Sequence, residues 1–199
     1  MPRAGLTPAV VTVAGAELVD EVGVAGLSMG LLAERLGVRP PSLYKHVDGL
    51  ADLTHRVAVL GMTEVGDAIG AAIQGCSGYD ALAAAAQALR AYVKDHPGRY
   101  AVGNDARAGG PDDPLAAAAA RLLGVLTAVL RGYRLDPGQE VHALRLLRSA
   151  VHGFATIEAA GGFRLETDVD ESFRWLVDRV DAGLRAAGAP ESSPGPDAR

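Results

Sequence analysis

Apolar residues recur every three or four positions along most of this chain, which is the spacing of an amphipathic helix. The first such helix begins at the cap-and-proline pair Thr7-Pro8 and ends at Gly23. No strand-length stretch alternates apolar and polar residues, so we expect essentially no sheet. The pattern therefore predicts an all-α protein.

Glycine and proline divide this pattern into further helices and three regions. Asp48 is the predicted cap of a long fourth helix, and later helices are predicted at about 79–95, 114–131, 137–160 and 168–187, with a loop at 96–98. The predicted regions are an N-terminal three-helix domain, a C-terminal helical bundle and a disordered tail, at 1–48, 49–187 and 188–199.

Two short predicted helices lie between Gly26 and Val47. Ser28 caps the first, Gly37 permits a positive φ at the turn, and Pro40 begins the second, which is predicted to run to His46. Such a pair forms a helix-turn-helix, whose second helix fits the major groove of DNA. A helical hairpin with no role in DNA binding gives the same pattern, so both interpretations stay open on spacing alone.

The segment Leu27–Val38, followed by Ser42–Val47, resembles the DNA-binding signature of the tetracycline-repressor (TetR) family of bacterial transcription regulators. The resemblance covers residues 7–56. It implies an N-terminal DNA-binding domain, a helical ligand-binding and dimerisation domain, and repression relieved by a small molecule. Further along, Val151–Phe154 and Ala160–Phe163 look like a Trp-His-Gly-type helix of one branch of the family.

The resemblance also implies roles for single residues. It suggests a phosphate contact at Ser28 and a DNA-backbone contact by the Tyr44 hydroxyl. Arg39 and Lys45 are the best candidates to hydrogen-bond guanine, and Pro41 offers an apolar surface to a thymine methyl. The candidate DNA-binding residues are Ser28, Arg39, Pro41, Ser42, Tyr44, Lys45 and His46.

Charge leaves an alternative open. The chain has a net charge of −5, although the segment 26–47 holds three cations and one acid. Leu50 stands where many relatives carry a phosphate-binding lysine, and Gly30 stands where some carry an arginine. Phosphate neutralisation should therefore be modest. The alternative is an all-α ligand-binding and dimerisation module with weak or lost DNA binding, and His46 either contacts phosphate or simply faces solvent.

The resemblance implies a ligand pocket among the middle helices. The apolar and aromatic side chains of these helices either line this pocket or belong to the ordinary hydrophobic core. An apolar or aromatic ligand fits the candidate lining. Arg145, Arg148 and His152 share one helix face, where they meet an anionic ligand or face solvent or an interface. The candidate ligand-binding residues are Tyr92, Tyr100, Leu122, Leu126, Phe154 and Ile157.

One helix-turn-helix covers only half of an operator, so a homodimer on palindromic double-stranded DNA is implied. Two apolar stripes on the last two long helices are the predicted dimer interface, although part of each stripe must face the chain's own core. The interface candidates are Leu144, Leu147, Val151, Phe173, Leu176, Val177, Val180 and Leu184.

Other functions have little support. No nucleophile motif, phosphate loop or metal-ligand spacing is present, so neither an enzyme nor a cofactor or metal is expected. The single cysteine, Cys76, excludes an internal disulfide. The apolar stretches are expected to stop short of the ~20 residues of a membrane span, and no signal-peptide pattern is found. We therefore expect a cytoplasmic protein.

Overall fold

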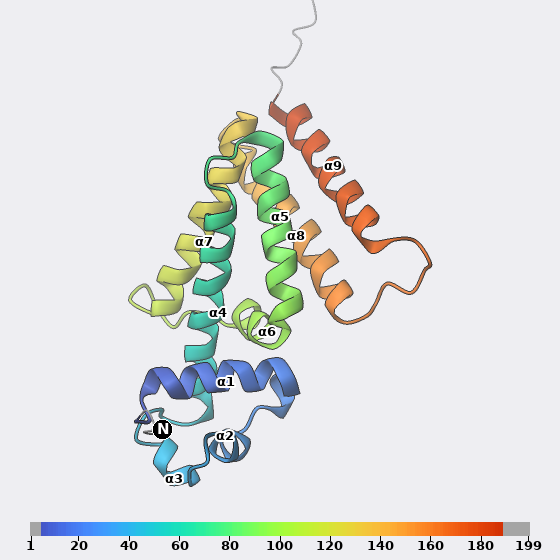
Figure 1. Ribbon diagram of the computed structural model, residues 1–199. Coiled ribbons are helices and arrows are strands. Elements are labelled where there is room, and N and C mark those ends of the chain that lie inside the picture. The colour runs from blue at the N-terminus through green and yellow to red at the C-terminus, as the bar shows by residue number, and fades with distance from the viewer. Residues whose placement is uncertain (1–4, 189–199) are drawn as a thin grey trace, which may run out of the picture.

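The computed structural model describes residues 5–188, and this part of the chain consists of helices and connecting loops without a strand (Figure 1). The prediction of an all-α fold is confirmed. The elements, with the two 3-10 turns η1 and η2, are α1 (Pro8–Val22), η1 (Val24–Gly26), α2 (Met29–Leu36), α3 (Pro40–Leu43), α4 (Leu50–Ala72), α5 (Gly78–Asp95), α6 (Pro97–Asp105), α7 (Pro114–Leu130), η2 (Arg131–Tyr133), α8 (Glu140–Ala159) and α9 (Val169–Gly188).

Helices α1 to α3 pack around a core of their own at one end of the molecule (Figure 1). The side-chain oxygens of Thr7 and Ser28 accept N–H groups of the first turns of α1 and α2, as predicted. Gly37 ends α2 with φ +65°, which glycine adopts at little cost. Leu32 and Leu43 are fully buried, and they fix α2 and α3 against α1.

The start of α4 differs from the prediction. Gly49, with φ +105°, is the cap residue, so the prediction that Asp48 caps this helix is wrong. The Asp52 carboxylate instead accepts the backbone N–H of Asp48 at 2.9 Å. An acid in the first helical turn thus accepts an N–H of the chain just before the cap residue.

Helix α4 belongs to both halves of the molecule. It leaves the N-terminal helices and continues into the bundle of α5, α7 and α8 (Figure 1). Leu53 and Val57 are buried in the N-terminal core, whereas Val65 and Ile69 are buried in the core of the bundle. One continuous helix therefore connects the two cores.

Helix α6 lies where the sequence was interpreted as a loop, and that prediction is wrong. Pro97 occupies the first helical position, where its fixed φ is favourable. The next residue, Gly98, lies against α1: a Cβ there would be 2.0 Å from the carbonyl oxygen of Val19. A Cβ on Gly61 of α4 would be 2.9 Å from the carbonyl oxygen of Arg99. Two glycines therefore allow α6 to pack closely against both α1 and α4.

A buried arginine attaches α9 to the bundle. Arg90 on α5 is 4% exposed, and its Nε and Nη2 donate to the Glu158 carboxylate of α8 at 2.6 and 2.7 Å. Nη2 also lies 2.7 Å from Asp170 at the start of α9. The guanidinium covers the ring of Phe173 at 4.6 Å. This cluster pairs a buried charge fully and joins three helices.

The segment Pro114–Tyr133 is long and apolar enough to cross a membrane by length and composition alone. The expectation that every apolar stretch stops short of span length is therefore wrong for this segment. Its helix, α7, packs along α4 in the bundle and lines a cavity there, and bundle helices pass the same test. The predicted tail, apart from Gly188 at the end of α9, lies outside the described residues.

Candidate nucleic-acid interface and ligand cavity

Helix α3 and the turns that follow it have an apolar inner side and a polar outer side. The inner residues Leu43 and Val47 are buried at 0% and 2% exposure. The helix is shorter than predicted, because turns replace it after Leu43, but the N–H of Val47 still donates to the Leu43 carbonyl at 3.1 Å. The outer side exposes Arg39, Pro41, Tyr44 and Lys45, with Ser42 and His46 half-buried.

Two cations of this outer side carry no acidic partner. Among the residues that the structure describes, no carboxylate oxygen lies within 4.0 Å of Arg39 or Lys45. Arg35 on α2, in contrast, is paired with Glu21 of α1. Gly30 and Leu50 are exposed and uncharged. The surface thus offers two cations to an anionic partner, at the end of the molecule opposite α9 (Figure 1).

The capping residue Ser28 is half-buried at the N-terminus of α2. Its Oγ accepts the N–H of Leu31 at 3.3 Å, which leaves the hydroxyl hydrogen available to an acceptor outside the helix. Ser28 therefore lies at a helix start, as predicted, where a phosphate oxygen is well accommodated.

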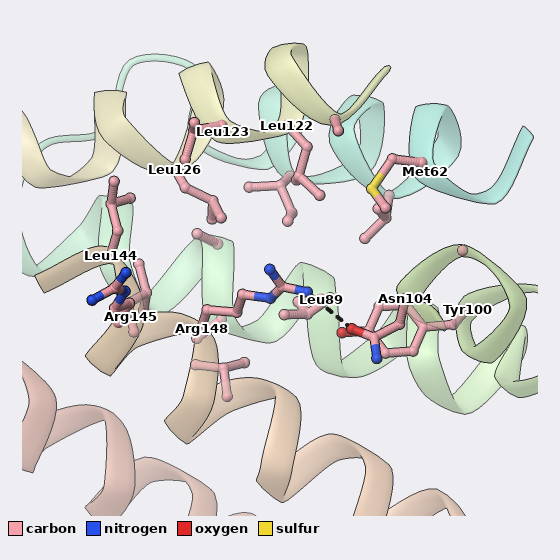
Figure 2. A pocket seen from close by; sticks show the side chains of 18 of the residues that line it. Met62, Leu89, Tyr100, Asn104, Leu122, Leu123, Leu126, Leu144, Arg145 and Arg148 are labelled. Carbon is pink, nitrogen blue, oxygen red and sulfur yellow. Dashed lines mark hydrogen bonds between the residues drawn. The ribbon is translucent and has the colours of Figure 1, made fainter. Parts of the chain in front are cut away.

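A cavity of about 360 Å3 lies between α4, α5, α6, α7 and α8 (Figure 2). This volume is within the range of small-molecule sites, about 300–1,000 Å3. Most of the wall is aliphatic, and Figure 2 shows side chains of α7 facing those of α8 across the space. The larger apolar lining residues are Met62, Val65, Ile69, Leu89, Leu122, Leu123, Leu126, Val141, Leu144, Leu147 and Val151.

Three of the six predicted ligand-binding residues line the cavity: Tyr100, Leu122 and Leu126. The other three do not. Tyr92 is buried behind Tyr100, with the ring centroids 6.4 Å apart, and Ile157 is 48% exposed on α8. Phe154 packs on Phe163 and Phe173, toward α9 and away from the cavity. Helical spacing alone did not show which side of α8 faces the cavity.

Polar groups gather at one part of the wall. Arg145 and Arg148 come from α8, and Arg148 donates from Nη2 to the Oδ1 of Asn104 on α6 at 3.1 Å (Figure 2). Both arginines lie beside the cavity and both are exposed to solvent, so the two alternatives for this helix face stay open. Asn104 was missed because no helix was predicted between residues 95 and 114, although Pro97 is typical of a helix start.

The third member of that helix face, His152, lies behind Tyr100. The Tyr100 hydroxyl and the Nδ1 of His152 are 2.8 Å apart. Burial raises the pKa of Tyr100 to about 12. Burial, together with the Arg148 charge, lowers the pKa of His152 below its ordinary 6.5. This hydrogen-bonded pair is therefore uncharged at neutral pH.

A buried ion network connects the cavity wall to α1. Arg99 on α6 is 7% exposed, and its Nε donates to Asp20 of α1 at 2.7 Å. Its Nη1 donates to Glu64 of α4 at 3.0 Å, and the Tyr92 hydroxyl donates to the same carboxylate at 2.8 Å. Tyr92 in turn contacts the cavity residue Tyr100. Direct contacts thus lead from the cavity to the helix that supports α2 and α3.

The apolar stripes predicted as a dimer interface face the chain's own core. Six of the eight side chains are only 2–6% exposed within one chain, and Leu144 and Leu176 pack partly on the same core. Exposed apolar residues lie on other sides of these helices, at Leu146, Ile157 and Trp175. The buried six are Leu147, Val151, Phe173, Val177, Val180 and Leu184.

Metal chemistry finds no support in the geometry: over residues 5–188, no three His, Cys, Asp or Glu side chains gather as a metal site. The nearest approach of a histidine to an acid is the pair of His55 and Asp113, 2.9 Å apart. The Asp113 carboxylate also accepts the N–H groups of Gly109 and Leu115, which lower its pKa. It therefore orders the loop before α7.

Comparisons with known proteins give sequence relatives for both halves of the chain. A family model described as the tetracyclin repressor-like C-terminal domain matches residues 82–180. YobS, an uncharacterised HTH-type transcriptional regulator of Bacillus subtilis (strain 168), is 32% identical over 187 residues, covering 92% of this chain and 95% of that protein. An uncharacterised HTH-type transcriptional regulator of Mycobacterium tuberculosis (strain H37Rv) is 34% identical. The matched residues cover 83% of this chain and 76% of that protein.

Solved structures share the fold at lower identity. A protein of unknown function from Rhodococcus sp. RHA1 superposes with a TM-score of 0.78 at 22% identity, covering 92% of this chain and 98% of its own. The Q116A variant of TetR from Acinetobacter baumannii AYE, solved in complex with minocycline, has a TM-score of 0.69 at 24% identity. It covers 94% of this chain and 100% of its own. The arrangement of helices in Figure 1 is thus a fold that these solved structures share.

Proposed function

Because this chain belongs to the TetR family of helix-turn-helix transcriptional regulators, a family without enzymatic activity, we propose that it is a dimeric repressor of its target genes. Two copies of α3 bind a palindromic DNA operator, and a small apolar or aromatic ligand in the cavity releases them. A regulator of this kind acts where the DNA is, so we place it in the cytoplasm. The Trp-His-Gly likeness of the C-terminal half stays a prediction.

The outer side of α3 is the observation that carries the DNA-binding part of the proposal. Arg39 and Lys45 extend from it without an acidic partner among the described residues. Arginine and lysine are the side chains that most often read guanine O6 and N7 in the major groove. The half-buried Ser28 at the start of α2 and the exposed Tyr44 after α3 suit phosphate contacts.

The cavity and the Arg99 network support control by a ligand. A structure of the same fold was solved in complex with minocycline, so the fold accommodates a small molecule. A ligand that moves Tyr100 acts on Tyr92, and through Glu64 and Arg99 on α1. Such a ligand shifts the spacing of the two α3 helices only by its different affinity for the two states, typically ~1–3 kcal/mol.

We place the dimer contact on the outer sides of α8 and α9. Leu146, Gly153 and Ile157 recur at helical spacing on α8, and a Cβ on Gly153 would meet nothing within 4 Å. Trp175 on α9 is 65% exposed. Large exposed apolar side chains beside a small residue suit close packing of helices from two copies.

The second candidate function is a ligand-binding and dimerisation module that no longer binds DNA. The uncharged, exposed Gly30 and Leu50 favour it, because each cation absent from the surface weakens phosphate binding. This module has the same cavity and the same dimer contact as the proposed repressor. The two candidates differ only in whether α2 and α3 bind DNA.

One experiment separates the two candidates. The full chain is mixed with a random pool of duplex DNA at low salt, and bound DNA is recovered and sequenced through several rounds. The proposal expects an enriched palindrome for the wild type and its loss or weakening for Lys45→Ala, with Arg121→Ala on the exposed side of α7 as a control that keeps it. Enrichment of no sequence would favour the module.

A further inference from the structure

We infer that the ligand of the cavity carries one acidic group beside an apolar body, and that Arg145 and Arg148 bind this group. The inference rests on the proposed function, because it describes the ligand of the same cavity. Both side chains extend from α8 into the space below α7 in Figure 2. They lie three positions apart, so one helix face presents both guanidinium groups to the same volume.

Arg145 and Arg148 are exposed residues and, unlike Arg90, Arg99 and Arg121, have no acidic partner. Arg90 and Arg99, which are buried, are each held by two carboxylates. Arg121 on the exposed side of α7 is paired with Asp67 of α4 at 2.6 Å. No carboxylate oxygen within residues 5–188 lies within 4.0 Å of Arg145 or Arg148. Their positive charges are therefore unmatched.

The rest of the cavity wall supplies no acid either. Its only other polar side chains are the Asn104 amide and the Tyr100 hydroxyl. Asn104 accepts one N–H of Arg148 at 3.1 Å, which fixes the direction of the guanidinium and leaves its other N–H groups available. Tyr100 is already paired with His152 and stays uncharged. The wall is thus positive at one place and neutral elsewhere.

This combination favours an amphipathic anion. The aliphatic wall gains free energy from burying a hydrocarbon body, which a wholly polar anion does not provide. A guanidinium binds a carboxylate through two parallel N–H bonds, and such charge-assisted bonds are roughly twice as strong as neutral ones. A neutral apolar ligand would gain nothing from the two exposed guanidinium groups, and a cationic ligand would be repelled.

The test uses three probes with the same ten-carbon chain: decanoate, decan-1-ol and decyltrimethylammonium. Isothermal titration calorimetry measures their binding to the wild-type chain, to the Arg145→Gln/Arg148→Gln variant and to Arg174→Gln. We expect decanoate to bind the wild type about tenfold more tightly than the alcohol, with the ammonium weakest. In the double variant this preference disappears while the alcohol's affinity persists, and Arg174→Gln behaves as the wild type.

Other outcomes overturn the inference. If decanoate and the alcohol bind the wild type equally, or if the double variant keeps the preference, the acidic group is not recognised by these arginines and only the ligand role of the cavity survives. If none of the three probes binds a wild-type chain whose helical circular dichroism is intact, the cavity is not an amphiphile site. The proposed apolar ligand then fails together with the inference.

Discussion

At the scale of single residues, DNA recognition depends on the few side chains that α3 and its turns expose. Lys45 contributes a positive charge, and Tyr44, which is 54% exposed, contributes a hydroxyl. Both side chains are exposed, whereas the neighbouring Leu43 is fully buried, so their removal should leave the N-terminal core intact. Their effects on DNA binding can therefore be measured without loss of folding.

We expect Lys45→Ala to weaken binding to the selected operator about tenfold, because a base contact of this kind contributes roughly 1–3 kcal/mol. Tyr44→Phe removes only one hydrogen bond and should weaken binding about threefold. Fluorescence anisotropy with labelled operator at several salt concentrations measures both effects. Wild-type affinity in both variants would mean that α3 does not contact DNA.

The pKa of His152 is a second prediction at this scale. Burial and the nearby Arg148 lower it, so the imidazole should titrate below 6.5 in an NMR experiment. The neutral form then stabilises the fold fully above pH 6.5, and this contribution is lost as the pH falls from 6.5 toward the lowered pKa. His152→Gln should therefore unfold with a smaller pH dependence between pH 7 and 5. An imidazole that titrates at or above 6.5 would contradict the account.

At the scale of elements, α6 is the structural link between the cavity and the N-terminal helices. It supplies Arg99 to the ion network, Tyr100 and Asn104 to the cavity, and Gly98 to the contact with α1. The close approach at Gly98 is a strict requirement, because the neighbouring atoms are backbone and not a flexible side chain. The link therefore depends on a residue without a Cβ.

We expect Gly98→Ala to lower the free energy of unfolding by about 1–3 kcal/mol or more through overpacking against Val19. The matched control is Gly103→Ala on the same helix, where the nearest atom to a new Cβ is 3.5 Å away. Alanine is the better helix former by about 1 kcal/mol, so the control should be neutral or stabilised. Urea denaturation compares the two. Equal stability of both variants would show that α6 does not lie tightly on α1.

The sequence predicted elements with clear signals and failed where the same signal has two meanings. Thr7, Ser28 and Gly37 mark helix ends through local hydrogen bonds and φ, so the N-terminal helices were predicted well. His96-Pro97-Gly98 is typical of a loop, yet here the proline starts α6 and the glycine allows a close contact. Only the tertiary packing shows whether such a Pro-Gly pair belongs to a loop or begins a helix.

The site was predictable to a similar extent. The helical period around the buried Leu43 determines which residues of α3 face outward. The sequence therefore predicted the exposed residues of α3. The cavity is made by five helices, and the side of α8 that faces it is set by the positions of α7 and α9. Spacing along one helix therefore placed Phe154 and Ile157 in the lining wrongly, and it left the role of Arg145 and Arg148 open.

At the scale of the whole molecule, the account requires two copies. Ile157 and Trp175 are apolar and exposed, and we expect both to be covered in the dimer. Ile157→Glu should weaken self-association at least tenfold, because it places a charge in an apolar contact. Analytical ultracentrifugation measures this, with Ala117→Glu on the exposed side of α7 as the control. Unchanged dimerisation of the Ile157 variant would place the contact elsewhere.

In the proposed complex, each of the two copies inserts its α3 into DNA. Hydroxyl-radical footprinting of the selected operator measures this arrangement. We predict two protected half-sites about 34–36 Å apart, related by two-fold symmetry, both weakened in Lys45→Ala and unchanged in Arg121→Ala. A single protected patch without symmetry, or a footprint that Lys45→Ala leaves intact, would contradict it.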